Sequence, residues 1–227
     1  MGFVAMEGAA MCLYPGGTWW NATTRGHRFW QNYLCDLEWR VALDGQPNAL
    51  GSTLAQAAMV LLVAGLAPFW LALPRLFAPH SSATPAPDER PAWSGRTPLV
   101  SRAVPALGLT SVVATTAAIF MPSDRFGALH GATVIVACVP GLAAAALAVL
   151  GLARGEPRPR VAAALGGAML AFAFVDFVLY ASHFLAHTEG STLVPALEKV
   201  ALILLLSWMV TVATRAGRAQ AAAQRKT

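Results

Sequence analysis

Charged residues are scarce in this chain of 227 residues, in which Asp, Glu, Lys and Arg together make up only 12%. A typical soluble domain carries about 25% charged residues. The hydrophobic residues reach 56% and the mean hydropathy is +0.55, so a sphere of this mass could not hide its apolar surface from water. This shortage of charge excludes a disordered chain and an ordinary soluble domain, and it indicates that lipid is the solvent.

The chain also lacks the short motifs of several enzyme classes. It contains no Gly-rich phosphate loop, no nucleophile elbow and no Cys-x-x-Cys pair. The three cysteines are too few for a disulfide scaffold, and Cys12 and Cys35 either pair on the outer side or stay free thiols. The formal net charge of +5 is spread between apolar runs rather than gathered in a patch, which argues against a nucleic-acid partner.

Five apolar segments are long enough to cross the ~30 Å hydrocarbon layer, which takes about 20 residues in a helix. They are predicted at 52–73, 99–121, 129–152, 161–185 and 193–214. Ser52 is the expected N-cap of the first segment. Residues 1–14 are also apolar, but a helix of that length reaches only about 21 Å, so we interpret them as a shortened first helix whose start is missing. The expected fold is an all-α polytopic transmembrane helix bundle, with residues 1–227 forming a single membrane domain.

Basic residues predict the orientation of the bundle, because Lys and Arg gather in cytoplasmic loops. Residues 74–98 form a Pro-rich linker, 153–160 a short basic turn and 215–227 a basic tail. These three connections contain eleven Lys and Arg residues when the first is extended to Arg102. The segments on the other side of the membrane contain five. We therefore predict a multi-pass protein of the cell (inner) membrane with a cytoplasmic C-terminus. The Ala- and Arg-rich, Lys-poor composition favours a bacterial source.

The segment at 15–50, predicted to face outward, is rich in aromatic residues interleaved with charged ones. Its aromatic residues include Trp19, Trp20, Phe29, Trp30, Tyr33 and Trp39. Rings with a polar edge favour the headgroup layer, where one end of the side chain is dry and the other is wet. The segment is therefore either an interfacial belt that seats the protein or a lid that contacts a ligand over the helix bundle.

Three stretches in and around this segment carry a resemblance to a known family. They are Leu13-Tyr14-Pro15-Gly16-Gly17, Arg28-Phe29-Trp30-Gln31-Asn32-Tyr33-Leu34-Cys35-Asp36-Leu37 and Asp44-Gly45-Gln46-Pro47-Asn48. The chain resembles, over most of its length, the DUF998 family of polytopic bacterial and archaeal membrane proteins, whose hallmark is an Asn-x-x-Ser-Asp-Leu-Gly-like stretch before the second helix. Here Cys35 stands in place of the Ser and Glu38 in place of the Gly. The resemblance implies a first helix before this stretch and implies no biochemical activity.

The span at 161–185 and the residues just after it carry polar side chains that each cost roughly 2.5–3.5 kcal/mol inside a membrane if ionised, and so need a partner or a purpose. These are Asp176, Tyr180, His183 and His187. On a helix they fall within an arc of about 60°, so they form one polar stripe near the outer face. The inner halves of the spans are apolar, which favours a one-sided pocket over a pathway through the membrane.

The topology adds His130, Asp36 and Glu38 to the same leaflet. One hypothesis is a zinc-dependent hydrolase of a lipid-like substrate, with His130, His183 and His187 as metal ligands and water in the fourth position. Its predicted catalytic residues are Asp36, Glu38, Asp176 and Tyr180, of which Asp176 orients a ligand and Asp36 or Glu38 acts as acid or base.

Three other interpretations stay open. In the first, the histidines are satisfied by headgroups and water, and Asp176 bonds to a neighbouring helix, so that the protein has an outward-opening polar pocket without metal. In the second, His130 faces His183 or His187 across a haem. In the third, protonation of Asp176 operates a small proton-linked carrier or sensor.

Overall fold

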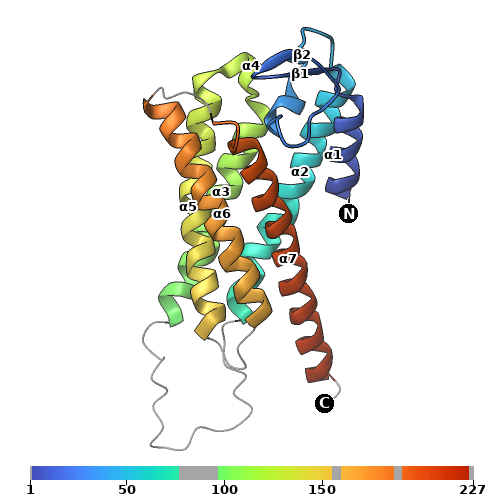
Figure 1. Ribbon diagram of the computed structural model, residues 1–227. Helices are drawn as coiled ribbons and strands as arrows, with labels where there is room; N and C mark the ends of the chain where they lie inside the picture. Colours follow the sequence, from blue (N-terminus) through green and yellow to red (C-terminus); the bar gives the residue numbers. More distant parts are fainter. Residues whose placement is uncertain (1, 77–96, 155–159, 187–190, 225–227) are drawn as a thin grey trace, which may run out of the picture.

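The computed structural model describes residues 2–76, 97–154, 160–186 and 191–224. In these ranges five helices are long and apolar enough to cross a membrane, and a short helix precedes them. The long helices are α2 (Ala49–Ala72), α3 (Thr97–Phe120), α5 (Ala128–Arg154), α6 (Arg160–Ala186) and α7 (Val194–Gln224) (Figure 1). Each overlaps one predicted span, so the all-α polytopic bundle is confirmed.

The first helix, α1 (Gly2–Leu13), reaches only halfway along the bundle. It packs against α2, and a Cβ placed on Gly2 would lie 3.1 Å from Leu61 Cδ1, near the middle of α2. Figure 1 shows the N-terminus at mid-height accordingly. A helix of 12 residues is about 18 Å long, which is too short to cross the hydrocarbon layer.

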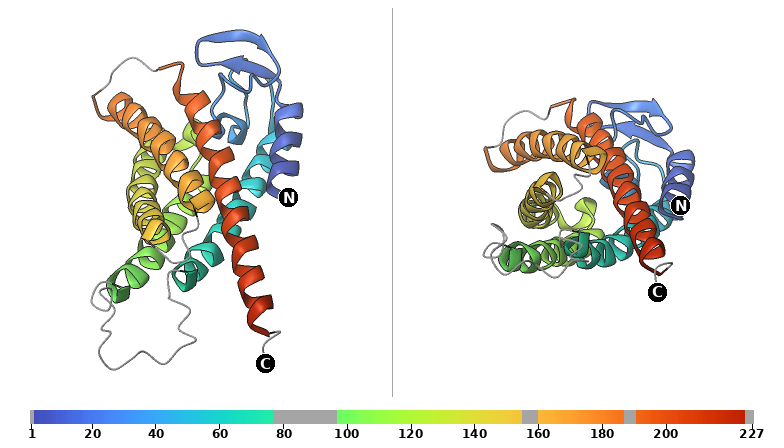
Figure 2. Two further views of the ribbon diagram at one scale, coloured as in Figure 1. Left: turned by 60° about the horizontal axis from the view of Figure 1, so that its bottom comes forward. Right: turned by 90° about the horizontal axis from the view of Figure 1, so that it is seen from below.

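Residues 14–48 form a cap over one end of the bundle, which we call the capped end. The cap contains an antiparallel hairpin of β1 (Gly16–Thr18) and β2 (Asn21–Arg25), followed by the 3-10 helix η1 (Cys35–Glu38). The short helix α4 (Ser123–Phe126) lies at the same end, and the C-terminus lies at the opposite end (Figures 1 and 2). The cap corresponds to the predicted aromatic-rich segment at 15–50, but its hairpin was not predicted.

The start of α2 corrects one detail of the prediction. The helix begins three residues before the predicted start, and Asn48 rather than Ser52 occupies the N-cap position. The Ser52 hydroxyl lies inside the first turns and donates to the backbone oxygen of Glu38 in the cap, at 2.7 Å. Ser52 therefore joins the cap to the bundle instead of starting the helix.

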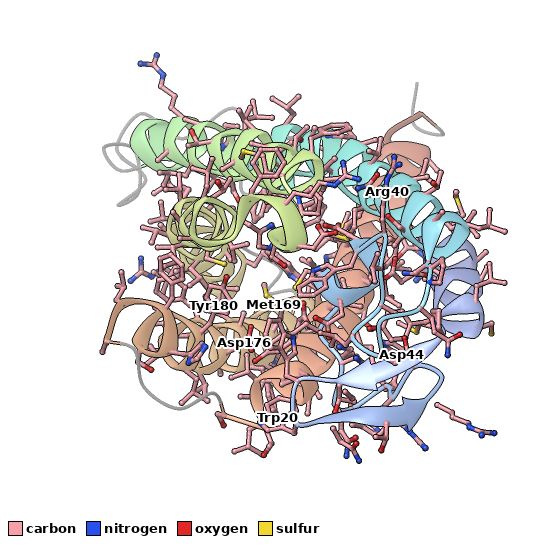
Figure 3. The ribbon with its side chains drawn as sticks, turned by 90° about the horizontal axis from the view of Figure 1, so that it is seen from above. Trp20, Arg40, Asp44, Met169, Asp176 and Tyr180 are labelled. Atoms are coloured by element: carbon pink, nitrogen blue, oxygen red, sulfur yellow. The ribbon has the colours of Figure 1, made fainter. Side chains whose placement is uncertain are left out.

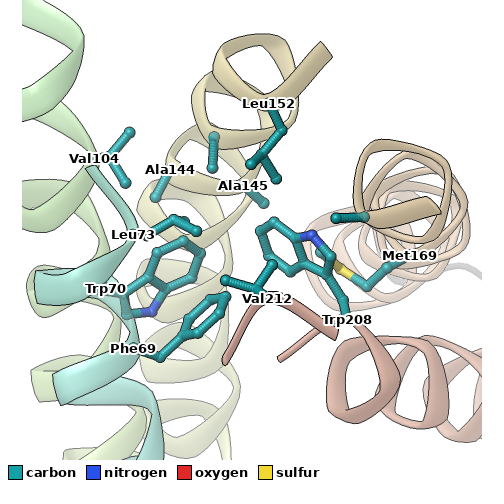
Figure 4. Packing of buried hydrophobic residues seen from close by; sticks show 12 residues of the cluster. Phe69, Trp70, Leu73, Val104, Ala144, Ala145, Leu152, Met169, Trp208 and Val212 are labelled. Atoms are coloured by element: carbon teal, nitrogen blue, oxygen red, sulfur yellow. The ribbon is translucent and has the colours of Figure 1, made fainter. Parts of the chain in front are cut away.

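The half of the bundle away from the cap is filled by a hydrophobic cluster that includes three aromatic side chains. Phe69 and Trp70 of α2 meet Trp208 of α7, with ring centroids 5.2 and 6.2 Å from the Trp208 ring (Figure 4). Small residues of α5, such as Ala144 and Ala148, let these rings approach. This half is therefore closed by apolar packing, and any cavity must lie nearer the cap.

We expect Trp208→Ala to lower the free energy of unfolding by about 3–5 kcal/mol, because it removes a fully buried ring from the centre of this cluster. The thermal unfolding midpoint in detergent measures the effect. Val210→Ala is the control, since Val210 lies on the same helix but is exposed. Equal midpoints for the two variants would contradict the central role of Trp208.

Candidate functional site

The cap is organised around the buried carboxylate of Asp36. Its Oδ1 accepts a hydrogen bond from Trp19 Nε1 at 2.9 Å. Its Oδ2 accepts from the backbone N–H of Tyr33 at 2.8 Å and from Asn32 Nδ2 at 3.2 Å. Burial raises the pKa of Asp36 to about 6, although these three donors act in the opposite direction. Asp36 thus fixes the hairpin turn, through Trp19, to the segment that precedes η1.

A buried lysine joins the cap to the bundle. Lys199 lies in the first turns of α7 and is 1% exposed, and its Nζ donates to the backbone oxygen of Asn32. The same Nζ pairs with Glu198 Oε2 at 3.3 Å. Glu198 Oε2 in turn accepts from the backbone N–H of Leu34 at 3.1 Å. Adjacent charges on α7 therefore hold two backbone positions of the cap.

Other hydrogen bonds hold the cap at its remaining edges. Asn48 Nδ2 donates to the backbone oxygen of Trp39 at 2.9 Å, and Trp39 Nε1 donates to Ser123 Oγ of α4 at 2.8 Å. With the Ser52 bond to Glu38, these contacts connect the cap to α2 and α4. The cap is therefore fixed to helices from three parts of the chain.

Beneath the cap lies a cavity of about 440 Å³, here called the outer cavity. Aromatic side chains dominate its wall, and Trp19 and Trp20 at its rim are 55% and 42% exposed. The remaining aromatic lining residues are Tyr33, Trp39, Tyr180 and Phe184. Two pairs of rings pack together in this wall. Trp19 lies edge-on to Trp39 with ring centroids 5.5 Å apart, and Trp20 is stacked on Tyr33 with ring centroids 6.5 Å apart.

A second cavity of about 220 Å³, the inner cavity, adjoins the first. Both cavities are lined by Tyr33, Cys35, His130, Tyr180 and Val194. The inner cavity differs from the outer one because three carboxyl side chains line it: Glu38, Asp176 and Glu198. Figure 3 views the molecule from the capped end, with Asp176 and Tyr180 on α6 and Trp20 beside the hairpin. The site therefore changes from an aromatic wall near the surface to a mostly apolar wall with three carboxyl groups farther in.

The predicted catalytic residues occupy different places. Asp176 and Tyr180 line the inner cavity, and Tyr180 reaches the outer cavity as well. Glu38 also lines the inner cavity, and burial together with the charges of Glu7 and Glu198 raises its pKa well above the usual range. Asp36 is absent from the lining of both cavities, and both of its oxygens are engaged in the cap.

The predicted metal ligands are only partly brought together. His130 and His183 line the outer cavity, and His130 Nδ1 bonds to the backbone oxygen of Met121 at 2.8 Å. His187 lies outside the described residues. Within the described ranges, no group of three or more His, Cys, Asp or Glu side chains could hold a metal ion. The zinc and haem hypotheses therefore stay predictions.

Three ionisable residues of this region were not predicted to take part in it: Glu7, Glu198 and Lys199. Glu7 is buried, and neither carboxyl oxygen has a hydrogen-bond partner among the described residues. Glu198 and Lys199 lie inside the apolar segment at 193–214, where charge is costly, so the reasoning that selected Asp176 applies to them equally. Lys199 was one of the five basic residues counted on the outer side, and its contacts with the cap were not predicted from that count.

The cysteines are free thiols, and Cys12 and Cys35 are not joined by a disulfide. Cys35, in the position where the DUF998-like stretch has Ser, lines both cavities. Burial and the nearby carboxylates raise the pKa of its thiol, so it is the neutral form that contacts the site.

Comparisons with known proteins leave the site to be interpreted from its own geometry. No family model, no curated protein and no solved structure matches the chain.

We expect Lys199→Met to loosen the cap, because it leaves the Asn32 oxygen and Glu198 without their cation inside the protein. Trypsin should then cleave at Arg25, Arg28 or Arg40 at least about tenfold faster than in the native protein, in line with a loss of more than ~1.4 kcal/mol of cap stability. The control is Arg102→Met, which removes an exposed cation far from the cap. An unchanged cleavage rate in the cap would rule out the role assigned to Lys199.

His27 makes the stability of the cap depend on pH. Its ring lies edge-on to Tyr14 at 5.9 Å, and burial together with the positive charge of Lys199 lowers its pKa to about 4. The unfolded chain takes up this proton near pH 6.5, so the contribution of His27 is complete above that pH and declines between pH 6.5 and 4, by at most ~1.4 kcal/mol per pH unit. Over that range the unfolding midpoint should fall more in the native protein than in His27→Gln. Parallel pH profiles for the two proteins would contradict this assignment.

Proposed function

We propose that this multi-pass integral membrane protein binds an amphipathic, lipid-like molecule in the paired cavities beneath the cap. The observation that carries the proposal is the wall shared by the two cavities, which joins an aromatic compartment to one that holds three carboxyl groups. A volume of about 440 Å³ for the outer cavity alone lies in the range of about 300–1,000 Å³ usual for small-molecule sites.

The lining favours a ligand with two chemically different parts. The rings of Trp19, Trp39 and Phe184 offer an apolar surface for a chain or a ring. Polar groups of His130 and Tyr180 at the shared wall, with the carboxyl groups beyond it, suit a polar head. A molecule of the lipid layer would present both parts, and the half-exposed tryptophans at the rim give it access.

We further propose that the capped end faces outward from the cell (inner) membrane and that the C-terminus is cytoplasmic, as the distribution of Lys and Arg favours. Membership of the DUF998 family is also a proposal. It is supported by the concentration of cap-forming residues, such as Asn32, Asp36 and Asn48, in the stretches that carry the resemblance.

Binding or sensing accounts for the geometry better than transport does. The hydrophobic cluster around Trp208 fills the other half of the bundle, between the cavities and the opposite end. A zinc-dependent hydrolase would need His187 beside His130 and His183, and His187 lies outside the described residues. Ligand binding is therefore the function that we put first.

The proposal is tested with dodecyl probes that carry a dansyl group at the chain end, added to the protein in phosphatidylcholine nanodiscs. Energy transfer from the cavity tryptophans should saturate at about one probe per chain for at least one headgroup. Ala128→Phe, which puts a ring into the outer cavity, should weaken that binding at least about fivefold. Leu129→Phe is the matched control, because Leu129 is exposed and is not among the lining residues. Transfer that rises without saturation for every headgroup would refute the proposal.

A further inference from the structure

We propose that the ligand of the paired cavities carries an organic ammonium group, which lies in the inner cavity against the carboxyl groups of Glu38 and Asp176. This inference rests on the proposed function, because it specifies the chemistry of the ligand for the same site. It is supported by the charges of the inner cavity, by the surroundings of two of its carboxyl groups and by the aromatic rings at the shared wall.

The carboxyl groups of the inner cavity exceed the cations near them. Three carboxyl side chains line the cavity, and Glu198 is the one that pairs with Lys199, at 3.3 Å. Lys199 is itself used by the cap, through the backbone oxygen of Asn32. Neither Glu38 nor Asp176 is in an ion pair that the described residues show, and the charge of Lys199, which acts on Asp176 from a distance, is paired with Glu198. A cationic ligand would supply the missing charge.

Glu38 is the clearest indication that the inner cavity needs a hydrogen-bond donor from a ligand. The residue is 4% exposed and lines the inner cavity, and the hydrogen bond that it accepts from Ser52 uses its backbone oxygen and not its carboxyl group. Asp176 Oδ1 is buried without a partner in the described part of the chain. Buried carboxyl oxygens normally accept hydrogen bonds, so these two carboxyl groups at one cavity indicate a donor that the protein itself does not provide.

The shared wall adds surfaces that attract a cation. Tyr33 and Tyr180 line both cavities, and Trp20 lies on Tyr33 in a stacked pair. The faces of such rings carry partial negative charge and attract ammonium groups. An ammonium with an apolar chain therefore matches the site along its length, with the cation at the carboxyl groups and the chain among the outer tryptophans.

The carboxyl groups favour an organic cation over a metal ion and disfavour an anion. Metal ions require several ligands converging at short distances, and the described residues contain no such group. An ammonium needs only one or two carboxyl groups and a ring face. An anionic headgroup would find no available cation here, because Lys199 is already paired with Glu198, and it would oppose ionisation of Glu38 and Asp176. A bound ammonium stabilises the ionised form of Glu38, so binding replaces the proton that burial favours there.

The experiment compares three dansyl-dodecyl probes that differ only in headgroup: trimethylammonium, neutral glucamide and carboxylate. We expect the trimethylammonium probe to bind the nanodisc-embedded protein at least about tenfold more tightly than the glucamide probe, and the carboxylate probe to bind most weakly. Binding of all probes with equal affinity, or tighter binding of the carboxylate, would overturn this inference while leaving the proposed function intact. Absence of saturable binding for every probe would remove both.

Two conservative variants test the assigned carboxyl groups. Glu38→Gln and Asp176→Asn should each reduce affinity for the trimethylammonium probe about tenfold and leave affinity for the glucamide probe unchanged. The unchanged glucamide binding shows that the variant is folded. Asp124→Asn is the matched control, because Asp124 is an exposed carboxylate at the capped end that lines neither cavity. A tenfold preference that survives both cavity variants would also overturn the assignment.

Discussion

The buried amine of Lys199 is the constraint on which the capped half of the molecule depends. A cation enclosed in an apolar bundle is stable only with acceptors around it, and these come from Glu198 and from the Asn32 backbone oxygen. Asn32 in turn bonds through its side chain to Gly17 and to Asp36. Asp36 holds Trp19, which forms part of the cavity wall. One chain of hydrogen bonds therefore runs from α7 to the surface that a ligand would meet.

The bundle divides into two halves with different physical tasks. Away from the cap, the rings of Phe69, Trp70 and Trp208 pack with small residues, and this half of the bundle is held by apolar contacts. Under the cap, two adjoining cavities are hollowed out, and polar groups from α5, α6 and α7 line them. The packed half holds the helices in position, and this allows the other half to keep an opening.

The sequence predicts the helices well because a membrane span is a simple pattern of length and hydropathy, and all five were located. It also placed Asp176, Tyr180 and His130 near one another, since helix periodicity and alternating topology fix both leaflet and face. Contacts between segments far apart in the chain could not be predicted from the sequence. The bonds from Glu198 and Lys199 to the cap join residues more than 160 positions apart, and no local pattern indicates them. The hairpin was missed because Gly16 and Gly17 are short signals inside an aromatic-rich stretch, although Gly17 has φ +87°, which favours glycine.

The bond between His130 and the backbone oxygen of Met121 determines which nitrogen of the ring is left for a ligand at the shared wall. A carbonyl oxygen only accepts, so Nδ1 must carry the hydrogen, and the neutral ring keeps its lone pair on Nε2. The same bond secures the corner between α3 and α5, so the ring that lines both cavities cannot exchange its donor and acceptor nitrogens without loosening that corner. The polarity of this part of the wall is therefore fixed by the turn that joins two helices.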